Sequence, residues 1–469
     1  MISDLKPYSK YKESGSRWLG YVPTHWGVHN LRTLIRRRNE RNRIDLPLLS
    51  VAREKGVFVR SLTDDKENHN VIPEDLSNYK VARAGNLVIN KMKAWQGSMG
   101  IAPCDGIVSP AYYVFDFDIA NRSFGQVLLR SKPYVTHFAQ VSDGVRIGQW
   151  DLTIAGMRQI PVLVPKEAEQ AAIVRFLNWT NKCMNRTIQA KRKVIALLNE
   201  QKQIIIHRAV TRGLDLSVPL KPSGIRWLGE VPAHWVIVTL RRKLCSFDGI
   251  KIGPFGSQLK LDQMSETGYK VYGQANVIAR DFARGKKFVD QKKFDALSVC
   301  ALRPGDLVIT MMGTSGRCAR IPDTADAGIM DSHLLRLRLD ASIDGNFAAL
   351  VIDEAPYVKG QILMAGKGSI MQGLNSSMVK ELILALPPLA EQTSILHFLN
   401  EATSSILETI DRTQREIELL HEYRTRLVAD IVTGKLDVRE AAAKLPEELK
   451  IDETEEVDEA EISDEEIAV

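Results

Sequence analysis

Two segments of this chain repeat at different offsets, and this repeat constrains the fold more than any other feature of the sequence. The motif RWLGYVPTHW, which begins at Arg17, returns from Arg226 as RWLGEVPAHW, an offset of 209 residues. A second segment, which begins at Pro165, returns at Pro387, an offset of 222 residues. The second copy is therefore longer by 13 residues, the difference between the two offsets, and all of them lie between the two motifs. A repeated frame with a changed interior predicts one scaffold that presents two different recognition surfaces.

The second repeated segment predicts a long helix in each copy. Residues at alternating spacings of four and three through 169–210, and through the repeat of this segment, form a mainly apolar heptad seam. Each segment follows a proline and opens with a Glu-Gln pair, which favours a helix start. About 40 residues at 1.5 Å each span roughly 60 Å. Neither helix can bury its stripe alone, so we expect an antiparallel pair; the alternative is that each stripe packs on its own globular domain. The predicted seam includes Ile173, Leu177, Thr187, Val194, Leu198, Gln201, Ile205, Ile395, Leu399, Thr409, Glu416, Leu420, Tyr423 and Leu427.

The segments between the motifs are rich in short apolar runs broken by glycine, which predict strands. Examples are residues 86–89, 112–115, 307–310 and 334–337. We therefore predict an α+β fold with a pseudo-twofold internal repeat. In this fold, two tandem α/β domains are separated by a pair of long antiparallel coiled-coil-like helices. The expected domains are residues 11–164 and 220–386, the helices 165–212 and 387–434, and an acidic tail 446–469.

The charge of the chain is distributed unevenly. From Glu447 to Glu466 there are 12 acidic residues and one lysine, so the rest of the chain carries +17 against +6 overall. A basic body indicates a polyanionic partner. The tail has no aromatic residue and is expected to be disordered. Its expected role is to aid solubility, and the alternative is a DNA mimic that reduces non-specific binding.

The sequence indicates a cytoplasmic protein without a catalytic site. It has no signal-peptide core and no apolar run of the ~20 residues needed to span a membrane. The five cysteines are scattered and form no CxxC pair, which favours reduced thiols. Phosphate-binding loops, dinucleotide-binding loops, methyltransferase signatures and metal-ligand clusters are all absent from the sequence. We therefore expect no catalytic residue and no metal; a nuclease built from scattered Asp and Lys is the disfavoured alternative.

The Trp motif predicts a framework role. Its residues Trp18 and Trp26 recur unchanged in the second copy, whereas residues that read different bases should differ between the copies. The alternative is that they stack on bases. His25 and His234 have no acidic residue at a fixed spacing, so a packing or hydrogen-bonding histidine is favoured over a catalytic one.

Basic clusters follow both Trp motifs, and their equivalent placement predicts a phosphate track that would position the protein on DNA. Solvated surface charge is the alternative. The clusters comprise Arg32, Arg36, Arg37, Arg38, Arg41 and Arg43 in the first copy, and Arg241, Arg242 and Lys243 in the second.

Glycine-punctuated loops with polar, basic or aromatic side chains are the better candidates for base contacts, because such side chains hydrogen-bond to base edges or stack on bases. In the first copy the candidates are Lys91, Lys93, Trp95, Gln96, Arg146, Gln149 and Trp150. In the second copy they are Lys251, Phe255, Ser257, Gln258, Lys260, Thr314, Ser315, Arg317, Lys367, Ser369 and Gln372.

Taken together, these motifs resemble a known family. Tandem WLGxVPxHW motifs, two variable segments and repeated PxxxEQxxIxxFLN helix openings are similar to the specificity (S) subunit of type I restriction–modification enzymes. The GPFGS loop from Gly253 and the PGDLVIT run from Pro304 look like parts of its target-recognition domains. The resemblance covers residues 11–437. The first copy departs from it, because it has Asn86 where the second has Asp306 and lacks the GPFG loop.

The resemblance implies a bacterial or archaeal DNA-binding subunit with two target-recognition domains. Each domain would read one half of a split target, and the helices would set the gap. Such a subunit binds no cofactor. It recruits two modification subunits, which methylate adenine with S-adenosylmethionine, and restriction subunits, which use ATP and Mg²⁺ for translocation and cleavage. Two alternatives from other classes stay open: a single-chain DNA-modifying enzyme, and a structural adaptor that binds acidic proteins.

Overall fold

The computed structural model describes residues 5–60, 75–146, 149–255, 258–260, 264–366 and 373–446. The acidic tail, and the role predicted for it, lie outside these residues. The chain forms two compact units: unit 1 comprises residues 1–190 and 416–469, and unit 2 comprises residues 191–415. Each unit contains part of both long helices, so the units do not coincide with the predicted domains. Within the described ranges, no helix is both long and apolar enough to cross a membrane.

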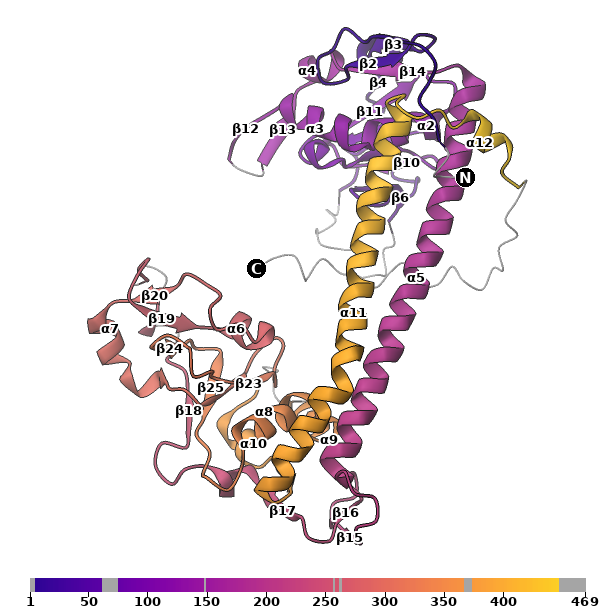
Figure 1. The fold of residues 1–469 in the computed structure, drawn as a ribbon. Coiled ribbons are helices and arrows are strands. Elements are labelled where there is room, and N and C mark those ends of the chain that lie inside the picture. Colours follow the sequence, from indigo (N-terminus) through magenta and orange to yellow (C-terminus); the bar gives the residue numbers. More distant parts are fainter. Residues whose placement is uncertain are drawn as a thin grey trace. The chain divides into compact units, whose positions relative to one another are not determined.

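The two predicted long helices are α5 (Glu167–Arg212) and α11 (Leu389–Val432), shown in Figure 1. In unit 1, Ile173 near the start of α5 belongs to the same core as Ile431 near the end of α11. In unit 2 the ends are exchanged, because Val210 near the end of α5 shares a core with Ile395 near the start of α11. The helices therefore pack in antiparallel orientation within each unit, as predicted.

The predicted heptad seam is correct at the helix starts, and further along each helix some of its positions are displaced by one residue. On α5 the buried positions shift by one residue after Met184: Ile188 and Ile206 are buried, whereas the predicted Thr187, Val194 and Gln201 are exposed. The reason is that 3.6 residues per turn do not match a strict repeat of 3.5, so a heptad stripe drifts by about 20° per heptad on a straight helix. Ile173 and Leu177 are buried, and Leu198 and Ile205 are half-buried.

On α11 one of the two seam positions in each heptad is also displaced by one residue. Thr409 and Tyr423 are exposed, and Ile417 rather than Glu416 is buried. The remaining predicted positions hold, because Ile395, Leu399 and Leu427 are buried and Leu420 is half-buried.

Unit 1 is built on a four-stranded antiparallel sheet with the order β4-β11-β8-β9. Shorter pairs flank it: β1-β2, β3-β14, β5-β6, β7-β10 and β12-β13. The predicted strands 86–89 and 112–115 correspond to β8 and β11. The elements before α5 are β1 (Tyr11–Glu13), β2 (Tyr21–Pro23), β3 (Gly27–Asn30), α1 (Leu31–Leu34), β4 (Ile35–Arg38), β5 (Leu49–Ala52), β6 (Gly56–Val59), β7 (Lys80–Ala82), β8 (Leu87–Asn90), η2 (Ala94–Gln96), β9 (Met99–Ile101), β10 (Gly106–Val108), β11 (Tyr112–Phe117), α2 (Arg122–Arg130), α3 (Lys132–Gln140), β12 (Ser142–Arg146), β13 (Gln149–Leu152), α4 (Ile154–Arg158) and β14 (Pro161–Val164); α12 (Arg439–Ala443) follows α11.

Unit 2 repeats the main sheet as β18-β25-β22-β23 and the strand pairs as β15-β16 and β17-β26. A second sheet, β20-β19-β24-β21, contains the parallel pair β19-β24. The elements are β15 (Leu220–Pro222), β16 (Glu230–Pro232), β17 (Val236–Thr239), η3 (Leu240–Lys243), β18 (Ile250–Ile252), β19 (Tyr269–Tyr272), α6 (Gln274–Ala279), β20 (Phe288–Val289), α7 (Gln291–Ala296), η6 (Ser298–Cys300), β21 (Ala301–Leu302), β22 (Leu307–Thr310), β23 (Cys318–Arg320), β24 (Gly328–Met330), β25 (Leu334–Leu337), α8 (Gly345–Glu354), α9 (Pro356–Gly366), α10 (Ser376–Lys380) and β26 (Ile383–Leu386).

The strand registers locate most of the additional residues of unit 2. Ile35 pairs with the end of β11, and Leu244 pairs with the residue at the equivalent place just after β25. The offset between Ile35 and Leu244 is 209, as in the Trp motif. Leu87 and Leu307 also pair with equivalent residues of β11 and β25, but the offset between them is 220. Most of the extra length therefore lies between these points, in the segment that contains α6, β20 and α7.

The Trp motif contacts the start of a long helix through the same residues in each unit. In unit 1, Glu169 accepts hydrogen bonds from Trp26 Nε1 at 3.0 Å and contacts His25 Nε2 at 2.8 Å. In unit 2, Glu391 makes the same contacts with Trp235 at 3.1 Å and His234 at 2.7 Å. Both indoles are fully buried. The predicted framework role of the motif is confirmed, and the histidines are hydrogen-bonding residues.

The glutamine of each Glu-Gln pair joins the helix start to the domain. Gln170 donates to the Pro165 carbonyl at 2.8 Å and accepts from the Asn121 backbone N–H at 2.9 Å. Gln392 makes the equivalent contacts with Pro387 and Asp344, both at 2.8 Å. Asn121 and Asp344 are the N-cap residues of α2 and α8, so one amide anchors two helices in each unit.

Two glycines are required by the backbone of the repeated frame. Gly20 and Gly229 of the Trp motif have φ values of +64° and +69°, a region that residues with a Cβ rarely adopt. The motif can therefore turn back so that β2 pairs with β1 and β16 pairs with β15.

Candidate nucleic-acid interface

The loop between the last two strands of the main sheet lies at an equivalent place in both units and carries candidate residues in both. In unit 1 it joins β8 to β9, and in unit 2 it joins β22 to β23. In unit 1, Lys91 begins the loop, and Leu152 N–H donates to its carbonyl at 2.8 Å. In unit 2, Leu374 N–H donates to the Met311 carbonyl at 2.9 Å in the same way. The framework therefore presents one loop per unit whose residues differ.

The unit 1 loop brings charged and aromatic candidates together. Lys91 Nζ lies 2.8 Å from an Asp151 carboxylate oxygen, and this hydrogen bond raises the pKa of the lysine. The indole rings of Trp95 and Trp150 are 5.0 Å apart at an angle of 59°. Asp151 and Trp150 both belong to β13, so the hairpin β12-β13 packs beside the loop. Lys93 is exposed and Gln96 is half-buried; the side chains of Arg146 and Gln149 lie outside the described residues.

A group of cations surrounds Tyr113 beside this loop. Arg37 lies 5.8 Å and Lys80 Nζ lies 5.9 Å from the ring centroid. Lys80 donates to the carbonyls of Pro110 and Tyr112. Burial lowers the pKa of Lys80, and the nearby positive charges, including that of Lys91, lower it further. Lys80 is buried, so the exposed Arg37 is the member of this group that is available to a polyanion. Lys80 and Tyr113 could not be recognised from the sequence, because single residues of these types in strands carry no signal of their own.

The arginines predicted as one phosphate track do not share one face. Arg36, Arg37 and Arg38 lie consecutively on β4, where successive side chains point to opposite faces. Arg38 forms an ion pair with Asp116 at 2.6 Å, whereas Arg37 lies over Tyr113 on the other face. The hydrogen bond from Arg38 lowers the pKa of Asp116. Of this cluster, Arg37 is therefore the residue that joins the cation group around Tyr113.

The other basic residues of the predicted clusters lie mostly at the surface. Arg32, Arg36 and Arg41 are exposed. Arg43 pairs with Asp45 at 2.7 Å. In unit 2, Arg241 and Arg242 are exposed on η3, and Lys243 Nζ donates to Ser342 Oγ at 2.7 Å.

The difference between Asn86 and Asp306 belongs to an exchange of charges at one position of the main sheet. In unit 1, Asn86 Nδ2 donates to Asp116 at 3.1 Å. In unit 2, Arg338 occupies the strand position of Asp116 and donates through Nε to Asp306 at 2.9 Å. Arg338 also pairs with Asp248. Each pair joins two residues of the same unit, so this difference between the units reflects the packing of each sheet.

In unit 2 the equivalent loop carries Thr314, Ser315 and Arg317. Thr310 Oγ1 donates to the Thr314 carbonyl and accepts from Arg317 N–H at 3.0 Å, which closes the loop. Thr314 is exposed, and Ser315 and Arg317 are half-buried. Arg317 Nε lies 2.7 Å from the buried carboxylate of Asp353.

The remaining candidates of unit 2 lie elsewhere on its surface or outside the described residues. Lys251 is half-buried on β18. Phe255 is 80% exposed, and its N–H donates to Gln258 Oε1 at 3.2 Å. Lys260 is exposed. The candidates that the structure does not describe are Ser257, Lys367, Ser369 and Gln372.

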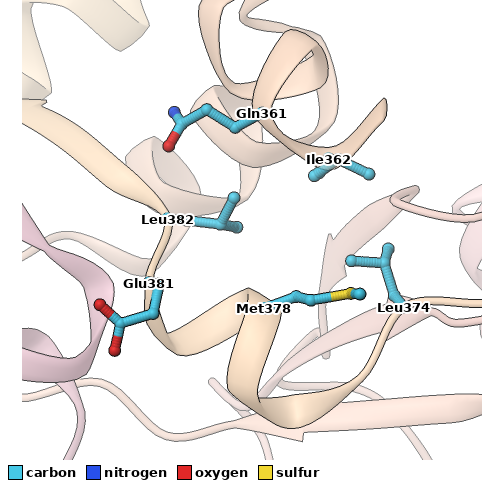
Figure 2. Close-up of a pocket in the computed structure, with 6 residues that line it drawn as sticks. All are labelled: Gln361, Ile362, Leu374, Met378, Glu381 and Leu382. Carbon is cyan, nitrogen blue, oxygen red and sulfur yellow. The ribbon is translucent and has the colours of Figure 1, made fainter. Parts of the chain in front are cut away.

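Unit 2 also contains a pocket of about 300 Å³ (Figure 2). Ile362, Leu374, Met378 and Leu382 line it together with Gln361 and Glu381. The polar atoms of Gln361 bond to Ile383 N at 2.8 Å and Ile383 O at 3.1 Å. The residue of unit 1 that is equivalent to Gln361 is Phe138, which is fully buried. The pocket thus lies where a large aromatic side chain of one unit is replaced by a smaller amide in the other.

Comparison with known proteins identifies the fold. No protein-family model matches the chain. A solved structure described as showing complex assembly and conformational transition of a type I R-M system aligns with a TM-score of 0.59 and 16% identity, covering 88% of this chain and 99% of that one. The chain therefore has the fold of a component of such a system. Two further likenesses are the HsdS subunit from Thermoanaerobacter tengcongensis (TM-score 0.44, 15% identity, 90% of this chain and 100% of that one) and a type I S subunit from M. genitalium (TM-score 0.35, 13% identity, 87% and 96%).

Proposed function

We propose that this chain is the DNA-recognition subunit of a type I restriction–modification complex. Each unit reads one half of a bipartite target, and the paired helices set the gap between the halves. The fold supports this proposal, because it is shared along almost the whole chain with a component of such a system.

The observation that carries the proposal is the contrast between the frame and the loops. Glu169 and Glu391 make the same contacts with the Trp motif to within about 0.1 Å. The equivalent loops differ, because unit 1 presents Lys91 and Trp95 where unit 2 presents Thr314 and Arg317. A constant frame with different side chains at one place fits two recognition surfaces for two different half-sites.

The proposal assigns the chemistry to partner subunits. Modification subunits would bind S-adenosylmethionine and methylate adenine, and restriction subunits would use ATP and Mg²⁺. This chain would bind none of these cofactors and would contribute DNA contacts and a scaffold. The exposed Arg37 beside the Tyr113 ring supports a polyanionic ligand.

Mapping of methylated adenines in the host genome tests the proposal. With the chain present, methylation should occur at one bipartite motif with a constant gap, and deletion of the chain should remove all methylation at that motif. Unchanged methylation after deletion would refute the proposal. Sequence-specific methylation or cleavage by the purified chain alone would instead support the single-chain enzyme.

A further inference from the structure

One carboxylate in unit 2 is buried completely and holds two arginines that reach the surface. Asp353 lies on α8, and its side chain is 0% exposed. Its Oδ1 accepts from Arg317 Nε at 2.7 Å and from the Cys318 backbone N–H at 3.0 Å. Its Oδ2 accepts from Arg280 Nη2 at 2.6 Å and from Arg317 Nη2 at 3.3 Å. The side chains of Arg317 and Arg280 are 34% and 54% exposed.

The electrostatics keep this group charged at neutral pH. Burial alone would raise the pKa of Asp353, but the hydrogen bonds from Arg317, Cys318 and Arg280 outweigh it and lower the pKa. The hydrogen bond to Asp353 likewise raises the pKa of Arg317. A charge-assisted pair of this kind fixes the plane of the guanidinium, because two parallel N–H groups meet one carboxylate.

The geometry leaves one edge of Arg317 directed away from the carboxylate. Asp353 engages Nε and Nη2, so Nη1 and the outer N–H of Nη2 form the adjacent, end-on edge. Two parallel donors on one edge match the O6 and N7 acceptors that guanine presents in the major groove. A phosphate contact would not need a fixed plane, since a mobile lysine serves equally well as a point charge.

This arrangement is specific to unit 2. The position equivalent to Asp353, counted from the N-cap residues of α2 and α8, is Arg130 in unit 1. Arg130 Nη2 donates to the Glu54 carbonyl at 2.7 Å, so it holds a turn instead of another side chain. The two units therefore use one position of one helix to support different loops.

We infer that Arg317 reads a guanine in the half-site of unit 2, with Asp353 and Arg280 as positioning residues. The inference rests on the proposed function and specifies the base class for one side chain. Asp353 orients the guanidinium of Arg317 through Nε and Nη2, and the hydrogen bond from Arg280 to Oδ2 holds the carboxylate in place.

The test is the methylation motif of the host, mapped for variants with the restriction subunit inactivated and the rest of the complex intact. Arg317→Lys should reduce the preference for guanine at one position of one half-site by about 10- to 100-fold. Asp353→Asn should weaken the preference at the same position, because an amide cannot accept from both arginines as a carboxylate does. The other half-site and the gap should not change.

Arg320→Lys is the matched control, because Arg320 lies on β23, three residues after Arg317, and pairs with Asp323 at 3.3 Å instead of Asp353. An altered preference at a position that is not guanine, or no altered position for Arg317→Lys, overturns the inference. If Asp353→Asn fails to fold, Arg317→Lys decides alone, since it leaves the buried carboxylate in place. Absence of motif-specific methylation in the wild type would count against the proposed function instead.

Discussion

The buried glutamate of each unit allows a quantitative test of the frame. Glu169 is 4% exposed in its side chain and accepts from Trp26 and from Tyr8 Oη, the latter at 2.7 Å. Both donors are buried. Glu391 is 25% exposed, and among the residues that the structure describes it accepts from one buried donor, Trp235. The two glutamates thus differ in the number of buried donors that depend on them.

Replacement of each glutamate by alanine should therefore have unequal effects. A buried donor left without a partner costs about 1–3 kcal/mol. Glu169→Ala leaves two such donors, so we expect a loss of about 2–6 kcal/mol in unit 1. Glu391→Ala leaves one, and solvent can reach it more readily, so about 1–3 kcal/mol or less is expected in unit 2.

Native-state hydrogen exchange measures the two losses separately, because it reports the opening free energy of each unit in the intact chain. Glu169→Gln serves as the conservative control, since its carbonyl oxygen can still accept from both Tyr8 and Trp26. Equal destabilisation of the two units by alanine, or greater destabilisation by Glu391→Ala, would show that the donor count does not determine the stability of the frame.

Other predictions concern recognition and pH. Exchange of residues 27–164 for another recognition segment should change one half-site of the methylation motif and leave the other half and the gap intact. Insertion of four residues near Lys191 should lengthen the gap by about two base pairs, since four helical residues add roughly 6 Å; an unchanged gap in the mapped motif would contradict the role of the helices. Trp95→Ala should weaken binding at one half-site by about 1–3 kcal/mol through lost stacking, as measured by fluorescence anisotropy with the assembled complex. Burial raises the pKa of Asp331 above its ordinary value, so the protein loses stability as pH rises from that ordinary value through the folded pKa; Asp331→Asn should raise the Tm near pH 7 and not near pH 3.

The repeated frame could be predicted from the sequence, because its signals are local or periodic. The Trp motif, the Glu-Gln helix start and the alternating apolar positions each depend on residues close together in the chain. The acceptor for His25 could not be read in the same way, because Glu169 lies 144 residues away. The signal existed nevertheless: Glu391 recurs with His234, at a separation of 157 residues, and the difference is the 13 residues added to unit 2.

The candidate site was less predictable, because its residues meet through tertiary packing. The loop positions Lys91, Trp95 and Arg317 could be nominated by residue type alone. Asp353 and Arg280 carry no comparable signal, since an acidic residue on an apolar helix and an arginine after a short helix are individually unremarkable. Which arginine is held by a buried carboxylate depends on how α8 packs against β23, and that contact is not encoded in any local pattern.

Where the two units differ in a buried side chain, the partner of that side chain differs as well. This limits how recognition can be transferred between the units. Asn86 and Asp116 of unit 1 correspond to Asp306 and Arg338 of unit 2, so the charge at each position changes together with its partner. A single substitution such as Asp353→Arg would bury a positive charge beside Arg317, with no carboxylate to balance it. Loss of one partner of a buried pair costs about 3–5 kcal/mol, which exceeds what one bidentate base contact supplies. Recognition should therefore be exchangeable between such chains by whole segments bounded by the Trp motif and the helix start, and not by single residues.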